Sequence, residues 1–326
     1  MLPISYSVGQ SPLYRLSSRK RMYELLQVTQ ADWVLLRRNK GYNCFPLPDR
    51  YRSTLPALRH KPRNVQSPEE LLKKTQKRLT DLLSRIELPE YLHSARKGHS
   101  YKTNALQHTF GHSLARIDIK KFYESTYISY VQRYFSEVLC CVPDVAHQLA
   151  DISTFGKRLP TGSPLSPLLS FLAYQPMFDE LYKLAREMEL TMTVYVDDVV
   201  VSGPGVASRF IEPASKIIAR YGLRAHKFST SSAGSPLVIT GVERRQTGDV
   251  APGARFRKIR ALQTELARAR TPERKCLFLK ALIGQYREGH ALIPNALVHA
   301  KRYERELNKF PVAAVKSRSR RLKKKT

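Results

Sequence analysis

The sequence predicts an α+β fold, in which strands that carry carboxylates are combined with long helical segments. Residues 191–203 have the pattern of two apolar strands on either side of an Asp-Asp pair, and residues 113–119 have the pattern of a third such strand. Helical patterns fill the N-terminal segment to about residue 40, residues 68–86 and residues 254–310. We see no internal repeat.

The helical segments have recognisable apolar stripes and starts. The N-terminal stripe at helical spacing consists of Tyr23, Leu26, Trp33 and Leu36. We expect Trp33 to anchor a core, because a large aromatic side chain on an apolar face is usually buried. Ser67-Pro68-Glu69-Glu70 opens the helix predicted over 68–86 with a capping residue and first-turn acids. The stretch 254–310 is rich in Leu, Ala and Arg and is predicted to be helical.

The Asp-Asp pair lies at the predicted turn between two strands. Residues 191–194 alternate with period two, and 199–201 are three valines that lead into Ser202-Gly203. Asp197 and Asp198 are poor strand formers, and adjacent carboxylates repel unless cations lie between them. Such a pair taken alone is more often a solvated turn, so the metal interpretation depends on a further carboxylate.

A further carboxylate, Asp118, stands in the predicted strand 113–119. Two such strands side by side would present Asp118 and Asp197 to a pair of Mg²⁺ ions held roughly 3.5–4 Å apart. Two ions in this arrangement would activate an attacking hydroxyl and neutralise a leaving pyrophosphate.

Four motifs stand in the order and spacing of the palm motifs of reverse transcriptases, and the chain resembles that family over roughly residues 40 to 300. The motifs are Asp118-Ile-Lys-Lys-Phe-Tyr123-Glu-Ser125, Leu159-Pro-Thr-Gly-Ser-Pro-Leu-Ser-Pro167, Tyr195-Val-Asp-Asp198 and Gly222-Leu-Arg-Ala-His-Lys227. Within the family it is most similar to bacterial retron enzymes, because Asn104-Ala-Leu-Gln-His108 matches their Asn-Ala-x-x-His box. Ile239-Thr240-Gly241 resembles their Val-Thr-Gly triplet.

This resemblance implies a right-hand polymerase with fingers, palm and thumb. We expect a helical N-terminal segment over 1–40, fingers and palm over 41–241, a helical thumb over 242–315 and a disordered basic tail over 316–326. A retron enzyme would use two Mg²⁺ ions and dNTPs to copy part of a cognate structured non-coding RNA into a branched RNA–DNA molecule (msDNA). It would work with an effector protein in anti-phage defence. The alternatives are another prokaryotic reverse transcriptase, group II intron-like or defence-associated, and a catalytically silent RNA-binding protein on a polymerase scaffold.

The resemblance also assigns roles to residues. Asp118 and Asp197 are the expected main metal ligands, Asp198 supports them, and Lys227 acts on the pyrophosphate. Tyr123 is expected to block a ribose 2′-hydroxyl, although a core aromatic would suit the same position. The expected nucleotide-binding residues are Tyr123, Phe122, Thr161, Gly162, Tyr195 and Arg63. The expected RNA-binding residues are Asn104, His108, Lys316, Arg318, Arg320 and Arg321.

The chain departs from the family pattern at three places. Thr161 stands where family members usually have Gln, which packs beside the incoming nucleotide. Val196 replaces the Ala that is common in retron enzymes. The first family block is matched poorly, by residues 63–68. We expect the change at Thr161 to bear on nucleotide affinity and fidelity.

The charge supports a nucleic-acid partner independently of any motif. The chain has 56 Lys+Arg against 27 Asp+Glu, a formal net charge of +29, which favours a polyanionic ligand. We find no run of about 18 apolar residues and no signal-peptide core, so we expect a cytoplasmic protein without a membrane partner. Cys140 and Cys141 lie in an apolar run and are expected to pack in a core rather than bind zinc. Seven of the eleven residues from Lys316 to Thr326 are cations, which excludes a packed core there.

Overall fold

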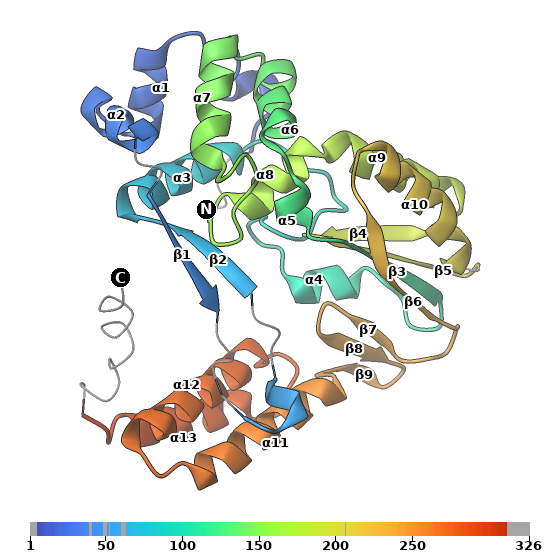
Figure 1. The fold of residues 1–326 in the computed structure, drawn as a ribbon. Coiled ribbons are helices and arrows are strands. Elements are labelled where there is room, and N and C mark those ends of the chain that lie inside the picture. Colours follow the sequence, from blue (N-terminus) through green and yellow to red (C-terminus); the bar gives the residue numbers. More distant parts are fainter. Residues whose placement is uncertain are drawn as a thin grey trace. The chain divides into compact units, whose positions relative to one another are not determined.

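The computed structural model describes residues 5–38, 41–47, 51, 53–59, 63–205 and 207–311. The chain divides into two compact units, which we describe separately. The first unit comprises Met1–Pro46 and Asn64–Thr240, and the second comprises Leu47–Arg63 and Gly241–Thr326. The expected tail 316–326 lies outside the described residues. Helices and strands both contribute to the first unit, which confirms the predicted α+β class (Figure 1).

A four-stranded antiparallel sheet forms the centre of the first unit, with the strand order β4-β5-β3-β6. The strands are β3 (Ser113–Ile119), β4 (Thr191–Tyr195), β5 (Asp198–Gly203) and β6 (Ala225–Ser231). Burial of apolar residues stabilises this sheet, and Ala115, Ile117 and Val199–Val201 are all buried. The two strands that were expected to lie side by side, 113–119 and 198–203, are hydrogen-bonded neighbours.

Helices pack on the sheet and around it. Helix α9 contacts β4, and α10 contacts β3 and β6 (Figure 1). The helices of the first unit are α1 (Arg19–Leu26), α2 (Gln30–Arg38), α3 (Glu70–Leu83), α4 (Tyr101–Leu106), α5 (Phe122–Ser125), α6 (Ile128–Arg133), α7 (Pro143–Ser153), α8 (Ser166–Ala173), α9 (Gln175–Glu187) and α10 (Ile211–Arg220). Short helical turns of this unit are η1 (Val8–Gln10), η3 (Tyr134–Val138) and η4 (Ala207–Phe210), whereas η2 (Pro56–Leu58) belongs to the second unit. Two further strands, β1 (Tyr42–Leu47) and β2 (Arg63–Pro68), form a ribbon, and β7 (Leu237–Ile239) lies against α4.

The predicted core anchor and helix start can be compared directly with the structure. Trp33 is buried, as predicted, and its indole N–H donates to Gln148 Oε1 at 2.7 Å. The helix expected over 68–86 begins only at Glu70. Pro68 instead ends strand β2, since a proline has no N–H for a helix and fits the extended edge of a ribbon. Of the adjacent cysteines, Cys141 is buried as expected, but Cys140 is exposed.

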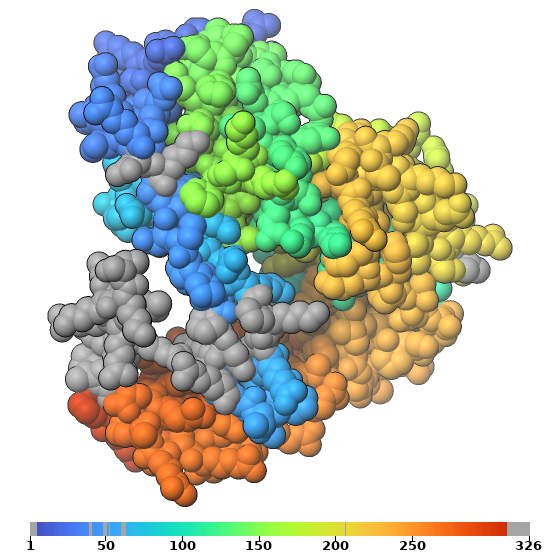
Figure 2. Space-filling view, in the orientation of Figure 1, coloured from blue at the N-terminus to red at the C-terminus, as the bar shows by residue number. Residues whose placement is uncertain are grey.

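In its described part, the second unit contains a hairpin, the short helical turn η2 and three longer helices. Strands β8 (Val242–Arg245) and β9 (Gly248–Val250) pair antiparallel, and they precede α11 (Gly253–Arg268), α12 (Pro272–Glu288) and α13 (Ala296–Leu307). The helical prediction for 254–310 is thereby confirmed as three helices, whose residues form the orange to red surface in Figure 2. Helix α12 is the central element, because it contacts both α11 and α13 and buries Phe278, Leu279 and Leu282. Across the described part of both units, no helix is long and apolar enough to cross a membrane.

Candidate active site

Three carboxylates meet at one end of the central sheet. Asp118, near the end of β3, is the register partner of Asp198, the first residue of β5. Asp197 occupies the turn between β4 and β5, and its carbonyl accepts a hydrogen bond from the Ile119 N–H at 2.8 Å. The hairpin and the neighbouring strand therefore bring together the residues that the sequence pattern singled out.

Asp197 is a partly buried carboxylate in a negative environment. Burial raises its pKa above the ordinary value, and the charges of Asp118 and Asp198 raise it further. Lys227 acts in the opposite direction. Among the residues that the structure describes, no Lys, Arg or His lies within ion-pair distance of the Asp197 carboxylate. Asp197 thus has a charge that a bound cation would compensate.

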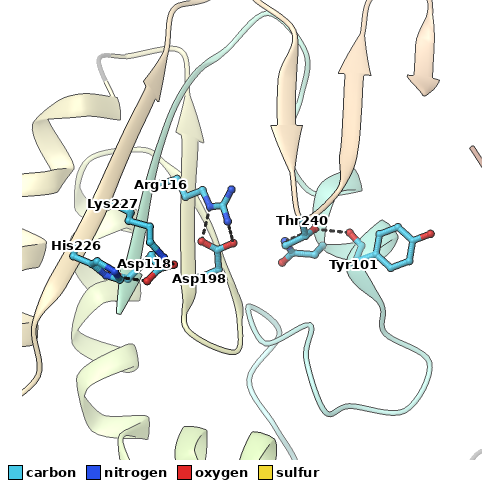
Figure 3. A network of polar contacts seen from close by, with 8 residues as sticks. Tyr101, Arg116, Asp118, Asp198, His226, Lys227 and Thr240 are labelled. Carbon is cyan, nitrogen blue, oxygen red and sulfur yellow. Dashed lines mark hydrogen bonds and ion pairs between the residues drawn. The ribbon is translucent and has the colours of Figure 1, made fainter. Parts of the chain in front are cut away.

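Asp118 differs, because two basic side chains of β6 reach it. His226 Nδ1 lies 2.9 Å from Asp118 Oδ1, and Lys227 Nζ lies 3.2 Å from Asp118 Oδ2 (Figure 3). Consecutive strand residues normally point to opposite faces. Here the register with β3 shifts between Arg116 and Asp118, and Lys227 has a left-handed φ of 52°. Such a bulge turns Lys227 so that both neighbours contact one carboxylate.

Asp198 has its own partner, Arg116, which lies two residues before Asp118 on β3. The pair is bidentate, with Arg116 Nε 2.5 Å from Oδ1 and Nη2 2.5 Å from Oδ2 (Figure 3). Burial raises the pKa of Asp198 even though Arg116 opposes the shift. Sequence reasoning missed Arg116, although its position at i−2 from Asp118 places it on the same face of the strand.

The arrangement fits a divalent cation at Asp118 and Asp197 better than at all three carboxylates. In the described part of the chain, no group of three or more His, Cys, Asp or Glu side chains is arranged to hold a metal ion. Both carboxylate oxygens of Asp198 contact Arg116. The remaining donors are carboxylate oxygens, the ligand type that Mg²⁺ prefers. The supporting role that was expected for Asp198 stays a prediction.

Phe122 and Tyr123 begin helix α5 just after Asp118 and have different environments. Tyr123 is half-buried, and its pKa is raised by burial and, to a smaller degree, by the charge of Asp197. Tyr123 therefore lies within electrostatic range of Asp197, and its expected place beside the nucleotide stays a prediction. Phe122 is buried and its ring packs against Tyr174 and Phe178. This placement argues against the nucleotide contact expected of Phe122, because its ring is part of the core.

The loop with Thr161 and Gly162 lies against strand β2. The Thr161 N–H donates to Gln66 Oε1 at 3.1 Å, and the Thr161 hydroxyl lies 3.1 Å from both Gln66 Oε1 and the Asn64 carbonyl. A Cβ at Gly162 would meet the Gln66 carbonyl oxygen at 2.5 Å, so only glycine permits this approach. Gln66 is a second residue that the sequence did not single out. Arg63 is exposed at the start of β2.

The Asn-Ala-x-x-His box is internal. Asn104 and His108 have no exposed surface. The Asn104 amide donates to Thr240 Oγ1 at 3.3 Å, and the two His108 ring nitrogens lie 2.7 Å from Ser202 Oγ and 2.8 Å from Thr193 Oγ1. The position of both residues argues against the expected RNA contact, because a side chain without exposed surface cannot touch a ligand. Their bonds instead fasten the box to β4, β5 and Thr240. The other expected RNA-binding residues, Lys316, Arg318, Arg320 and Arg321, lie outside the described residues.

Comparison with known proteins identifies the class to which this fold and site belong. Residues 56–231, more than half of the chain, match the family model described as "Reverse transcriptase (RNA-dependent DNA polymerase)". The chain belongs to this family, as its motifs predicted.

Three similar curated proteins are retron reverse transcriptases. The chain is 25% identical over 222 residues to the retron Se72 reverse transcriptase of Salmonella heidelberg (strain 579083-10), covering 65% of this chain and 57% of that protein. It is 28% identical over 178 residues to the retron Mx65 reverse transcriptase of Myxococcus xanthus, covering 49% of this chain and 41% of that protein. The chain therefore spans about half the length of these relatives. Among solved structures, telomerase from Candida albicans in complex with a fragment of telomeric RNA aligns with a TM-score of 0.43 and 11% identity, covering 91% of this chain and 66% of that chain.

Proposed function

We propose that the protein is an RNA-directed DNA polymerase that uses dNTPs and a divalent cation, Mg²⁺ in the cell. The observation that carries the proposal is the partly buried Asp197 carboxylate, which has no cationic partner among the described residues and lies beside Asp118. Family membership supports the same reaction.

The residues of the site have separate tasks in this proposal. Asp118 and Asp197 would hold the metal, and a bound divalent cation would supply activation of the primer hydroxyl and neutralisation of the pyrophosphate. Lys227, whose side chain is largely exposed and contacts Asp118, would stabilise the charge of the leaving pyrophosphate. Tyr123 closes the space beside the sugar, and Asp198 stays neutralised by Arg116.

Asp197→Asn tests this function. We expect the variant to lose extension of oligo(dT) on poly(rA) with dTTP and Mg²⁺, because the substitution removes a ligand charge at little change in volume. Asp81→Asn on the exposed surface of α3 is the matched control and should extend like the parent. Substantial extension by Asp197→Asn would refute the assignment. RNA binding should be nearly equal in all three proteins, since the charge of +29 is hardly changed.

We further propose that the substrate is a cognate structured non-coding RNA of the retron type, that the product is a branched RNA–DNA molecule, and that both act with an effector protein in anti-phage defence. The names of the similar curated proteins support this proposal. Sequencing of the nucleic acid that copurifies with the protein tests it directly. A branched hybrid with one conserved RNA partner would support a retron. A linear cDNA from mixed RNAs would favour another prokaryotic reverse transcriptase.

A further inference from the structure

We propose that Ser94 is a positioning residue for Asp197. Its hydroxyl holds the backbone of the turn that carries Asp197, although Ser94 is not a metal ligand. The inference rests on the proposed function, because it concerns the same carboxylate. It assigns a role to a segment before α4 that none of the sequence motifs includes.

The turn between β4 and β5 has an unfavourable backbone conformation. Val196 has a φ of 61°, in the left-handed region. A β-branched residue rarely adopts this region, since its side chain collides with the backbone there. Strained residues of this kind persist only where surrounding contacts fix them. The conformation of Val196 matters for chemistry because the next residue is Asp197.

Two hydrogen bonds fix the turn from opposite sides. The Val196 N–H donates to Ser94 Oγ at 2.9 Å, and Ser94 is only 3% exposed. The Asp197 carbonyl accepts from the Ile119 N–H at 2.8 Å, next to Asp118 in the chain. The backbone on both sides of the Asp197 side chain is therefore tied down, on one side by Ser94 and on the other by β3.

Ser94 itself is placed by a rigid segment. The His93 N–H donates to the Val194 carbonyl at 3.0 Å, and the Val194 N–H donates to the Tyr91 carbonyl at 2.7 Å. These bonds add the segment as a short parallel extension beside β4. The Tyr91 hydroxyl also donates to Asp179 Oδ1 at 2.5 Å, which ties the segment to α9. The segment that carries Ser94 is thus held by contacts outside the turn, so the Ser94 hydroxyl can determine where the Val196 backbone lies.

Loss of the hydroxyl leaves the partly buried Val196 N–H without its acceptor and allows the turn to relax toward an unstrained conformation. The Asp197 carboxylate then moves with the backbone. The expected consequence is weaker metal binding and a lower kcat, whereas the KM for nucleotide changes less, because Ser94 is buried and has no surface that could contact a nucleotide. A merely structural serine would change stability without changing metal affinity.

The test compares Ser94→Ala in two backgrounds, the parent and Val196→Gly. Glycine adopts the left-handed region without strain, so the turn no longer needs the Ser94 bond. In the parent background we expect Ser94→Ala to lower kcat on poly(rA)–oligo(dT) about tenfold and to weaken Mn²⁺ binding, measured by calorimetry, by a similar factor, the scale of one hydrogen bond. In the Val196→Gly background the same substitution should change either quantity by less than about twofold.

Equal losses in the two backgrounds would overturn the inference, as would a Ser94→Ala protein with the kcat and Mn²⁺ affinity of the parent. If Ser94→Ala does not fold at the assay temperature, the double variant decides. Recovery of folding and Mn²⁺ affinity in Ser94→Ala/Val196→Gly supports the role, and failure to recover refutes it. A parent protein that does not extend primers contradicts the proposed function instead, and the Mn²⁺ measurement then still tests Ser94 on its own.

Discussion

Arg116→Met removes the guanidinium that neutralises Asp198 and keeps a side chain of similar length. The pair is bidentate, with both contacts at 2.5 Å. We expect the variant to be destabilised, because Asp198 would remain in a largely buried position without a cation. The effect tests whether the ion pair with Arg116, shown in Figure 3, stabilises ionised Asp198 in the folded protein.

The size of the effect follows from the exposure of the two side chains. Removal of one partner of a buried pair costs about 3–5 kcal/mol, whereas an exposed pair contributes about 0–1 kcal/mol. The side chains of Arg116 and Asp198 are 36% and 11% exposed, so the pair lies between a buried and an exposed pair, and nearer the buried one. We therefore expect a loss of about 2–3 kcal/mol in the free energy of unfolding. Arg116→Met/Asp198→Asn should recover most of it, because the double variant has no unpaired charge.

Urea unfolding in EDTA at several pH values measures this loss. Burial raises the folded-state pKa of Asp198, so ionised Asp198 disfavours the folded state at neutral pH, and removal of Arg116 raises that pKa further. The loss in Arg116→Met should be complete above the folded-state pKa and should shrink as the pH falls through it, since protonated Asp198 needs no cation.

Arg220→Met is the matched control. Arg220 contacts Glu180 at the same distance of 2.5 Å, but the two side chains are 65% and 40% exposed. The control should lose less than about 1 kcal/mol. Our reasoning would be refuted if Arg116→Met lost no more than this control, or if its loss were the same at pH 4 and pH 7.

Three further substitutions test individual residues. Tyr123→Ala should reduce discrimination against ribonucleotides roughly tenfold or more in single-nucleotide extension, because it opens the space beside the sugar. Unchanged discrimination would show that Tyr123 is only a core aromatic. His108→Ala should lower the free energy of unfolding in urea by about 3 kcal/mol, since it leaves two buried hydroxyls unpaired, and should leave the salt dependence of RNA binding unchanged. The control His147→Ala, at an exposed position, should change neither quantity. A flatter salt dependence in His108→Ala would restore the RNA-binding role. Thr161→Gln must displace Gln66 and should change the KM for dNTP about fivefold, the scale of one hydrogen bond, whereas parental kinetics would show that the position does not contact nucleotide.

The sequence by itself determined the part of the site that depends on local pattern. Alternation over 191–194 and the run of valines at 199–201 predict a hairpin around Asp197 and Asp198, and the apolar strand around Asp118 pairs with one strand of that hairpin. The apolar stripe likewise determined that Trp33 is buried. These predictions succeeded because a strand or helix with one apolar face has few ways to bury it.

Only the tertiary structure decided which side chains surround the carboxylates. The bulge turns Lys227 so that its side chain reaches Asp118 together with that of His226, although strict alternation places these two neighbours on opposite faces. Asn104 lies in a box that resembles that of retron enzymes and was expected to bind RNA, but its side chain is buried and bonded to the distant residue Thr240. Such features are set by left-handed backbone residues and by pairings between distant segments. Their energies come from the assembled fold, so no local pattern of residues encodes them.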